Sequence, residues 1–172
     1  DWAQAHGAAA ALFTFKLPGG SKIKGRRLFS VEDKRRIVAG LGIEHYLVPA
    51  FADIMAMTPE QFVLGLVADC RARAFFCGEN FTFGAKAAGD PALLKKLCAP
   101  LGVEVHVLPM AAFEGRPVSS TRIRAALEGG DIPAVNAMLG TPYAIRFPVQ
   151  HGAGLGRTLG VPTINQIYPE GY

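Results

Sequence analysis

The sequence predicts an α/β domain built on a doubly wound parallel sheet, followed by the opening of a second, β-rich domain. Short apolar segments alternate with capped helical segments over residues 9–139. Such alternation is typical of right-handed βαβ units, whose helices cover both faces of a parallel sheet. After residue 140 the alternation stops and a glycine-rich loop appears. In a doubly wound sheet, ligands bind beyond the carboxyl ends of the strands.

The elements of the predicted sheet can be assigned in chain order. Four short apolar segments are predicted to be strands, at residues 9–15, 44–49, 73–77 and 103–108. Five helices are predicted between and after them, at about residues 30–41, 58–68, 90–101, 121–128 and 131–139. Capping signals mark their first turns, most clearly Ser30 with Asp33 and Thr58 with Gln61. The loops that follow the strands are therefore the first candidates for a ligand site.

The C-terminal part of the chain follows a different pattern. Residues 143–149 are predicted to be a strand, and a glycine-rich loop follows it at residues 151–160. No helix is expected after this loop, because Pro162 would block one. We therefore predict two domains, at residues 1–140 and 141–172.

Composition excludes several classes of protein. Half of the 172 residues are apolar and 19% are charged, which is typical of a folded chain rather than a disordered one. No apolar run approaches the roughly 18 residues of a membrane helix, and no secretory signal peptide opens the chain. The three cysteines form no CxxC pair, and their odd number favours a reducing, cytoplasmic location. The scattered histidines suggest no zinc site, and no GxSxG motif indicates a hydrolase.

Positive charge is concentrated in one segment. The formal net charge is +4, and residues 16–36 contain eight basic residues and two acidic ones. A segment of this kind can meet the phosphates of a nucleotide or of a nucleic acid. The alternative is a solvated loop and helix face that binds nothing.

The segment at residues 118–124 is the most informative for chemistry. It enters a predicted helix after the fourth strand, and unpaired backbone N–H groups at a helix start attract anions. Three hydroxyls add donors, and two guanidinium groups add charge that can grip phosphate oxygens: Ser119, Ser120, Thr121, Arg122 and Arg124. Together they predict a polyphosphate site, and the alternative is an ordinary serine cap followed by surface arginines.

A second candidate segment follows the third predicted strand, at residues 78–90. Phe81 and Phe83 can pack against a planar ring, and the Asn80 amide can read a ring edge through hydrogen bonds. Gly78 would allow close approach of a ligand to the backbone. The alternative is a turn whose aromatic side chains fold back into the core.

The third candidate is the glycine-rich loop. Its glycine spacing and the following proline do not fit a dinucleotide-binding turn. A loop with Gly154, Gly156 and Arg157 can still wrap phosphates. Thr163 and Asn165 offer oxygen atoms that suit Mg²⁺. The alternative here is a flexible hairpin.

Four blocks of the sequence, in this order, resemble the bifunctional riboflavin kinase/FAD synthetase of bacteria: residues 28–34, 78–90, 118–124 and 154–165. The resemblance implies that residues 1–140 form a Rossmann-like nucleotidyltransferase domain and that residues 141–172 begin a riboflavin kinase β-barrel. Two features of the family pattern are absent, an HxGH-like motif near the start and the glutamate of the kinase domain. The resemblance therefore implies an N-terminally incomplete first domain and a truncated second one.

The resemblance also implies two reactions. FMN and ATP would give FAD and pyrophosphate, and riboflavin and ATP would give FMN and ADP, both with Mg²⁺. It implies catalytic contacts to the ATP phosphates from Ser119, Ser120, Thr121 and Arg122. It implies nucleotide or flavin contacts from Gly78, Asn80, Phe81, Arg124, Gly154, Gly156 and Arg157, and Mg²⁺ contacts from Thr163 and Asn165.

Three other interpretations remain open at this point. One is an adenylyltransferase of the same fold that acts on a nicotinamide or pantetheine phosphate. Another is a non-catalytic or truncated module that binds flavin and nucleotide. The third is nucleic-acid binding through residues 16–36, which predicts a salt-sensitive affinity for oligonucleotides. We expect small molecules as partners, and neither nucleic acid nor a membrane.

Overall fold

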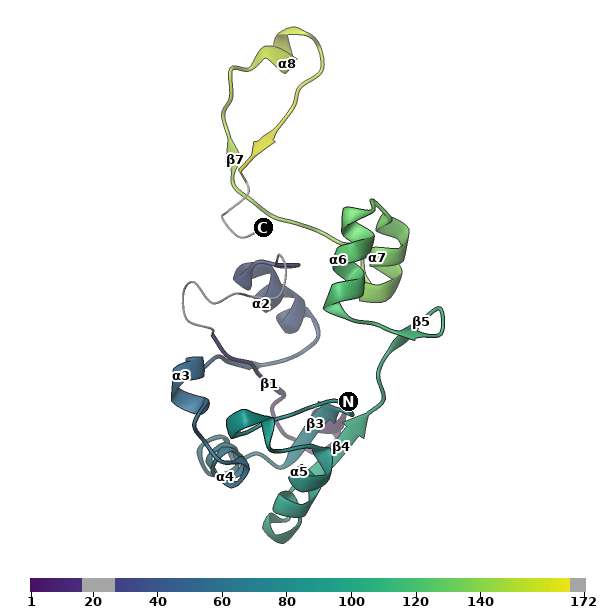
Figure 1. Ribbon diagram of the computed structural model, residues 1–172. Coiled ribbons are helices and arrows are strands. Elements are labelled where there is room, and N and C mark those ends of the chain that lie inside the picture. Colours follow the sequence, from purple (N-terminus) through teal and green to yellow (C-terminus); the bar gives the residue numbers. More distant parts are fainter. Residues whose placement is uncertain (17–26, 168–172) are drawn as a thin grey trace. The chain divides into compact units, whose positions relative to one another are not determined.

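The structure is a computed structural model that describes residues 1–16 and 27–167. They fall into two compact units, the first within Asp1–Ser21 and His45–Val118, the second within Lys22–Glu44 and Ser119–Tyr172. The middle of the basic segment, residues 17–26, lies outside the described residues. Figure 1 shows the elements in chain order.

The first unit contains two pairs of parallel strands with helices beside them (Figure 1). Strand β1 pairs with β2, and β3 pairs with β4, each in parallel. A short antiparallel hairpin, β5–β6, follows. The elements are α1 (Trp2–Ala5), β1 (Ala11–Phe13), β2 (His45–Leu47), α3 (Phe51–Ile54), α4 (Pro59–Cys70), β3 (Ala74–Gly78), η1 (Ala85–Ala87), α5 (Pro91–Cys98), η2 (Ala99–Leu101), β4 (Glu104–Leu108), β5 (Ala112–Phe113) and β6 (Arg116–Pro117).

The second unit is helical with a C-terminal hairpin. Helices α6 and α7 pack against each other, and β7 pairs with β8 in antiparallel fashion. Its elements are α2 (Val31–Gly40), α6 (Ser120–Glu128), α7 (Ile132–Leu139), β7 (Val149–Gln150), α8 (Leu155–Thr158) and β8 (Asn165–Gln166).

The predicted helix starts are confirmed. The Thr58 and Gln61 side chains accept hydrogen bonds from each other's backbone N–H, at 3.2 and 2.9 Å, which is a complete capping box. Asp33 N–H donates to Ser30 Oγ at 2.8 Å at the start of α2. Side-chain caps also begin α5, α6 and α7. The alternation of short strands and helices in the first unit is confirmed as a mixed α/β arrangement with small parallel sheets.

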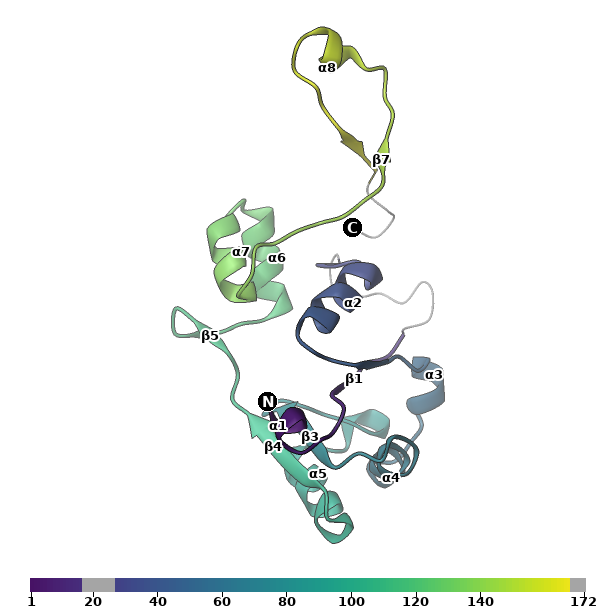
Figure 2. The same cartoon turned by 180° about the vertical axis from the view of Figure 1, so that it is seen from behind.

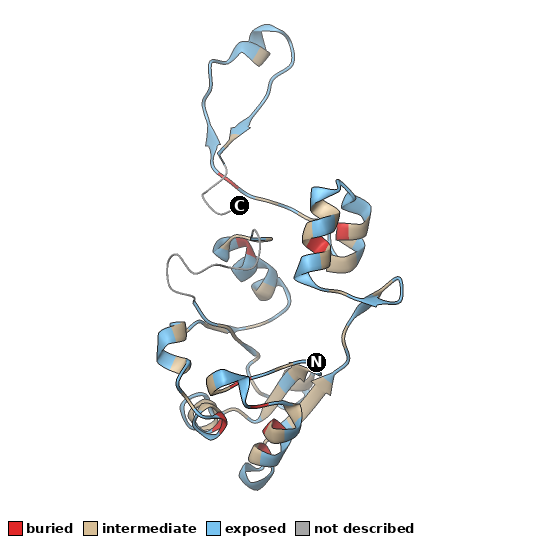
Figure 3. Cartoon of the chain, in the orientation of Figure 1, coloured by how far each residue is buried: buried red, intermediate tan, exposed pale blue. Residues whose placement is uncertain are grey.

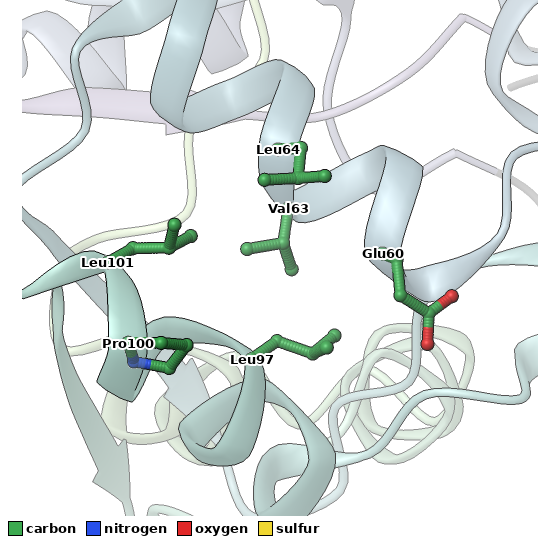
Figure 4. A pocket seen from close by; sticks show the side chains of 6 residues that line it. All are labelled: Glu60, Val63, Leu64, Leu97, Pro100 and Leu101. Atoms are coloured by element: carbon green, nitrogen blue, oxygen red, sulfur yellow. The ribbon is translucent and has the colours of Figure 1, made fainter.

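The core of the first unit lies between α4, α5 and the 78–89 loop. Val63, Phe83, Leu94 and Cys98 are its buried members (Figure 3). Figure 4 shows a groove beside this core, lined by apolar residues of α4, α5 and η2 and by Glu60. Since the groove offers a single polar side chain, which is an acid, it does not fit a phosphorylated ligand.

One prediction at the C-terminal side is wrong. Residues 143–149 are not a strand: residues 141–148 have no regular structure, and β7 begins only at Val149. Pro148 lacks an N–H group for a strand ladder, and the side chains of Tyr143 and Arg146 are bound to the segment around α2. One helical turn that was not predicted, α8, lies within the glycine-rich loop; among the described residues no helix follows Pro162, as expected.

Several short elements of the first unit were not predicted, namely α3, η1 and the two strands of the β5–β6 hairpin. Helix α3 has four residues and no side-chain cap, so it leaves little trace in the sequence. The turn of the β5–β6 hairpin places Glu114 and Gly115 at φ values of 52° and 69°. A two-residue turn with two positive φ angles is typical of a hairpin, but Glu-Gly is a weaker signal than Asn-Gly or Asp-Gly.

None of the helices within residues 1–16 and 27–167 combines the length and apolar character that crossing a bilayer requires.

Candidate functional site

The loop after β3 is held to the loop after β4 by hydrogen bonds. Glu79 N–H donates to the Leu108 carbonyl at 3.1 Å, and the Glu79 carboxylate accepts from Met110 N–H at 3.4 Å. Both strands end here, so the carboxyl edge of this parallel pair is a defined surface. Gly78 is the last residue of β3, and the exposed Asn80 begins the loop at this edge. Two of the predicted ligand contacts therefore lie where a parallel sheet binds ligands.

The aromatic residues of this loop point mainly toward the core. Phe83 is 5% exposed, and its ring stacks on Phe81 at a centroid distance of 5.6 Å. Phe81 is half-buried and packs against the core, so part of its ring stays accessible. The interpretation that the aromatics fold back inward is thus the better one for Phe83, whereas the predicted ligand contact of Phe81 stays a prediction.

Two glycines allow this loop to close around Phe83. A Cβ at Gly89 would lie 2.7 Å from the Phe83 ring, and one at Gly84 would lie 2.8 Å from Pro59 N. Gly84 also has a φ of 74°, which favours glycine. Between them, Lys86 and Ala87 adopt φ values of 55° and 56°. Two successive non-glycine residues in the left-handed region are unusual, and such strain concentrates at ligand-binding loops.

The start of α6 carries the second group of predicted residues, in the other unit. Ser119 Oγ accepts a hydrogen bond from Arg122 N–H at 3.3 Å and so caps the helix. Ser120 and Thr121 are exposed on its first turn. The side chains of Arg122 and Arg124 are partly exposed and both have interaction partners in the structure. The start of α6 therefore has two exposed hydroxyl residues, Ser120 and Thr121, followed in sequence by two partly exposed arginines.

The third group lies on the C-terminal hairpin. Gly154 begins α8 at a φ of 68°, Gly156 and Arg157 lie within α8, and Arg157 is exposed. A Cβ at Gly156 would lie 3.1 Å from Thr163 Oγ1, so the threonine lies against the loop backbone. Asn165 belongs to β8, and its amide lies against Gly152. The structure brings these residues together on one hairpin.

Neither a metal site built from histidine, cysteine and acidic side chains nor a thiol nucleophile is supported within the described residues. No group of three or more histidine, cysteine or acidic side chains suited to a metal ion occurs among the described residues. Burial raises the pKa of the Cys77 and Cys98 thiols, which disfavours the thiolate that a nucleophile needs.

One polar cluster of the first unit was missed by the sequence interpretation. Glu104 Oε2 lies 2.9 Å from His106 Nε2 and accepts from Trp2 Nε1 at 3.1 Å. The hydrogen bond from His106, and less strongly that from Trp2, lowers the pKa of the Glu104 carboxyl. The alternation of Glu104 and His106 along one strand was the available signal, since such residues share one face of a sheet. Figure 2 shows α1 beside β3 and β4, where this cluster lies.

The comparisons with known proteins divide the chain in two. The sequence model of the FAD synthetase family matches residues 1–122. The chain belongs to the FAD synthetase family. The riboflavin kinase model matches residues 139–171 of this FAD synthetase family member. The first match contains the loop after β3 and the first turn of α6, and the second contains the glycine-rich hairpin.

Individual relatives of this FAD synthetase family member carry the names of both families. The bifunctional riboflavin kinase/FMN adenylyltransferase of Escherichia coli is 34% identical over 141 residues, 81% of this chain and 45% of that protein. The protein of the same name from Bacillus subtilis is 30% identical over 172 residues, and the match covers 95% of this chain and 53% of that protein. The chain spans about half the length of the curated relatives it matches.

The chain shares its fold with solved structures, one of which is from Streptococcus pneumoniae. The crystal structure titled macrolide-efflux protein from Streptococcus pneumoniae superposes with a TM-score of 0.80 at 24% identity, covering 96% of this chain and 56% of that one. At this identity the likeness concerns the fold alone.

Proposed function

We propose that this chain acts in FAD biosynthesis, by adenylyl transfer from ATP to FMN, with an associated riboflavin kinase function. The observation that carries the proposal is the family match over residues 1–122, which includes the capped, hydroxyl-rich start of α6 and the loop after β3. The riboflavin kinase match at residues 139–171 supports flavin over nicotinamide or pantetheine phosphates as the substrate class.

In the proposed reaction, the FMN phosphate attacks the α-phosphorus of ATP in line, and pyrophosphate leaves. The residues of the α6 start act by binding and charge stabilisation, because phosphoryl-type transfer asks the protein mainly for positioning. Ser119, Ser120 and Thr121 bind the ATP phosphates, while Arg122 neutralises charge on the leaving group. Arg124 is proposed as a further nucleotide contact.

The remaining predicted contacts are assigned by reaction. Gly78, Asn80 and Phe81 would hold flavin or nucleotide at the carboxyl edge of β3. Gly154, Gly156 and Arg157 would surround the ATP phosphates used by the kinase, whose reaction gives FMN and ADP.

Mg²⁺ fits the donor set of the hairpin. Thr163 and Asn165 are exposed oxygen donors on one loop, and Mg²⁺ favours sites where few protein oxygens combine with water and substrate phosphates. When bound, the ion supplies charge neutralisation on the phosphates. Thr163 and Asn165 would hold it in the kinase part.

We also propose that the two strand pairs of the first unit belong to a single sheet. The pairs β1–β2 and β3–β4 would belong to one doubly wound, Rossmann-like sheet, in which a further parallel strand joins β1 to β3. Within the described residues, β1 and β3 each pair with a strand on one side only, which leaves room for such a neighbour. Residues 1–140 would form the nucleotidyltransferase domain, and residues 141–172 the beginning of a β-barrel. A cytoplasmic location, with small-molecule substrates as the partners, completes the proposal.

The first experiment is a single assay. The protein is incubated with FMN, ATP and Mg²⁺, and the flavins are separated by chromatography to look for FAD. Formation of FAD supports adenylyl transfer. Binding of FMN and ATP without FAD would identify a flavin- and nucleotide-binding module instead. Absence of binding to either ligand would overturn the proposed function.

Arg122→Ala tests the assigned residues. Loss of one charged hydrogen bond should weaken ATP use in FAD formation by about 1–3 kcal/mol. The matched control is Arg157→Ala, which should leave the ATP dependence of FAD formation unchanged. Unchanged ATP dependence in Arg122→Ala would contradict the assignment of the α6 start.

A further inference from the structure

The start of α2 contains a buried carboxylate that the proposed reactions do not use. Asp33 is 2% exposed and is the buried charged residue among those that the structure describes. Burial of an ionised carboxylate is unfavourable unless it is paired and hydrogen-bonded. Its partners therefore indicate what the residue is for.

The two oxygens of Asp33 serve different elements. Ser30 Oγ donates to Asp33 Oδ2 at 2.9 Å, which belongs to the local cap of α2. Arg146 donates to Asp33 Oδ1 at 3.1 Å from 113 positions away in the sequence. The guanidinium of Arg36, one turn along the same helix, lies farther away, at 3.9 Å. The cap itself needs only Ser30 and the backbone N–H of residue 33, so the Arg146 bond is an additional function.

Other contacts bind the same segment to the approach of α2. Tyr143 Oη donates to the Leu28 carbonyl at 3.0 Å, and its ring lies 5.7 Å from the ring of Phe29. Tyr143 N–H donates to Asn136 Oδ1 at 2.7 Å. Phe147, the next residue after Arg146, is 8% exposed. Residues 143–147 thus lack regular structure but are fixed by side chains.

The segment continues directly into the hairpin. Gln166 Nε2 in β8 donates to the Phe147 carbonyl at 3.0 Å, so the base of the hairpin is tied to the same place. The residues on one side of these contacts, 28–33, lie in the FAD synthetase match. Those on the other side, 143–147, lie in the riboflavin kinase match. An unanchored connection between two such regions would act as a hinge.

We propose that the entry to α2, residues 28–33, is the docking surface for residues 143–147, locked by the Asp33–Arg146 ion pair. Through this lock, the start of the region matched to riboflavin kinase is held to the entry of α2, which lies in the same compact unit and in the region matched to FAD synthetase. Asp33 is a positioning residue in this scheme and touches no substrate. The lock depends on contacts within one compact unit, and it stands whether or not the proposed reactions are found.

Limited trypsin digestion tests the lock directly, because cleavage after Arg146 requires this side chain to leave Asp33. Asp33→Ala removes both carboxylate oxygens but keeps the backbone cap on Ser30. Cleavage of the Arg146–Phe147 bond should become roughly tenfold to a hundredfold faster, the effect expected from losing a hydrogen bond between charged groups. Arg36→Gln is the matched control and should cleave at the wild-type rate.

Two internal reference sites separate local release from unfolding. Arg157 on the exposed hairpin and Lys95 in α5 should be cleaved at unchanged rates in Asp33→Ala. Equal acceleration at Lys95 would mean general unfolding and would count against a local lock.

A second measurement avoids the buried position. Tyr143→Phe removes the hydroxyl that donates to the Leu28 carbonyl, and hydrogen exchange of amides 143–147 should rise several-fold while α6 and α7 stay protected. An unchanged Arg146–Phe147 cleavage rate in Asp33→Ala, or an equal gain in Arg36→Gln, would overturn the proposal. Unchanged exchange in Tyr143→Phe would exclude the tyrosine from the lock.

Discussion

The α4–α5 region of the first unit and the C-terminal hairpin use apolar residues in opposite ways. Around α4 and α5, four apolar residues are buried, and Leu94 and Cys98 are almost inaccessible. On the hairpin, apolar residues are all more than half exposed: Val149, Leu155, Leu159, Val161, Ile164 and Ile167 (Figure 3). Similar side chains therefore contribute to a core in one region and lie in solvent in the other. Apolar composition by itself does not predict where the stability of this chain resides.

The two regions also differ in how the first turns of their helices are capped. Helix α4 has a complete capping box, whereas α8 begins at Gly154 without a side-chain cap. The first region thus satisfies its backbone groups locally and buries its side chains. The hairpin instead depends on the β7–β8 pairing and on the tie between Gln166 and Phe147.

The largest expected contrast comes from truncating one leucine in each region. Leu94→Ala should lower the free energy of unfolding by about 2–5 kcal/mol, because the side chain is 2% exposed and leaves a cavity. Leu159→Ala, at 72% exposure, should change it by less than about 0.5 kcal/mol. Urea unfolding followed by circular dichroism measures both. Comparable losses in the two variants would contradict the contrast.

The sequence carried enough information to predict the first region well. Side-chain caps such as Thr58 with Gln61 act within one turn, so they can be read without knowing the fold. A strand was predicted at residues 143–149, but long-range side-chain contacts hold this segment without regular structure. Asp33 binds Arg146 and the Leu28 carbonyl binds Tyr143, and neither long-range pairing leaves a local pattern.

The capping box provides the next largest effect. Thr58→Ala should destabilise the protein by about 1 kcal/mol, because the Gln61 N–H loses its acceptor at the start of α4. Thr158→Ala is the control in α8, where the hydroxyl donates to the Leu155 carbonyl on an exposed turn. We expect that variant to unfold at the wild-type urea midpoint. A larger loss at residue 158 than at residue 58 would reverse the comparison.

The candidate site was only partly predictable. The phosphate contacts of the hydroxyls and arginines at the start of α6 stay a prediction, and what the structure confirms is the serine cap of the alternative, at Ser119. The burial of Phe83 and the positive φ of Lys86 depend on how the 78–89 loop closes. A turn with inward-facing aromatic side chains was one alternative, but the positive φ angles of Lys86 and Ala87 depend on how the loop closes in three dimensions and cannot be predicted from the sequence.

Relief of the backbone strain at Lys86 should have a smaller effect on stability, and this effect should be stabilising. Lys86→Gly should stabilise the protein by about 0.5–1 kcal/mol, because glycine adopts a φ of 55° without a Cβ clash and the gain exceeds its larger unfolded-state entropy. Lys95→Gly is the matched control: the same substitution inside α5 should destabilise by about 1 kcal/mol. Thermal unfolding distinguishes the two signs. A destabilising Lys86→Gly would mean that the lysine side chain contributes more than the backbone strain costs.

The smallest effect is a pH dependence in the first unit. The pKa of Glu104 is lowered chiefly by the His106 hydrogen bond, so the folded state binds a proton on this carboxyl less readily than the unfolded chain does. The resulting stability is fully present above the ordinary glutamate value and is lost as the pH falls through the lower value of the folded state. Urea midpoints measured between neutral pH and pH 3 should therefore fall less steeply in Glu104→Gln than in the wild type.

The cluster also supplies its own probe and control. Trp2 is the single tryptophan of the chain and donates to Glu104, so its emission reports whether α1 stays against β4. His106→Gln removes the main cause of the lowered pKa and should flatten the pH profile nearly as much as Glu104→Gln. The double variant should add little, because both changes remove the same interaction. If the changes in pH dependence of the two single variants add up fully in the double variant, Glu104 and His106 act separately. Their hydrogen bond would then not be the cause of the pH dependence.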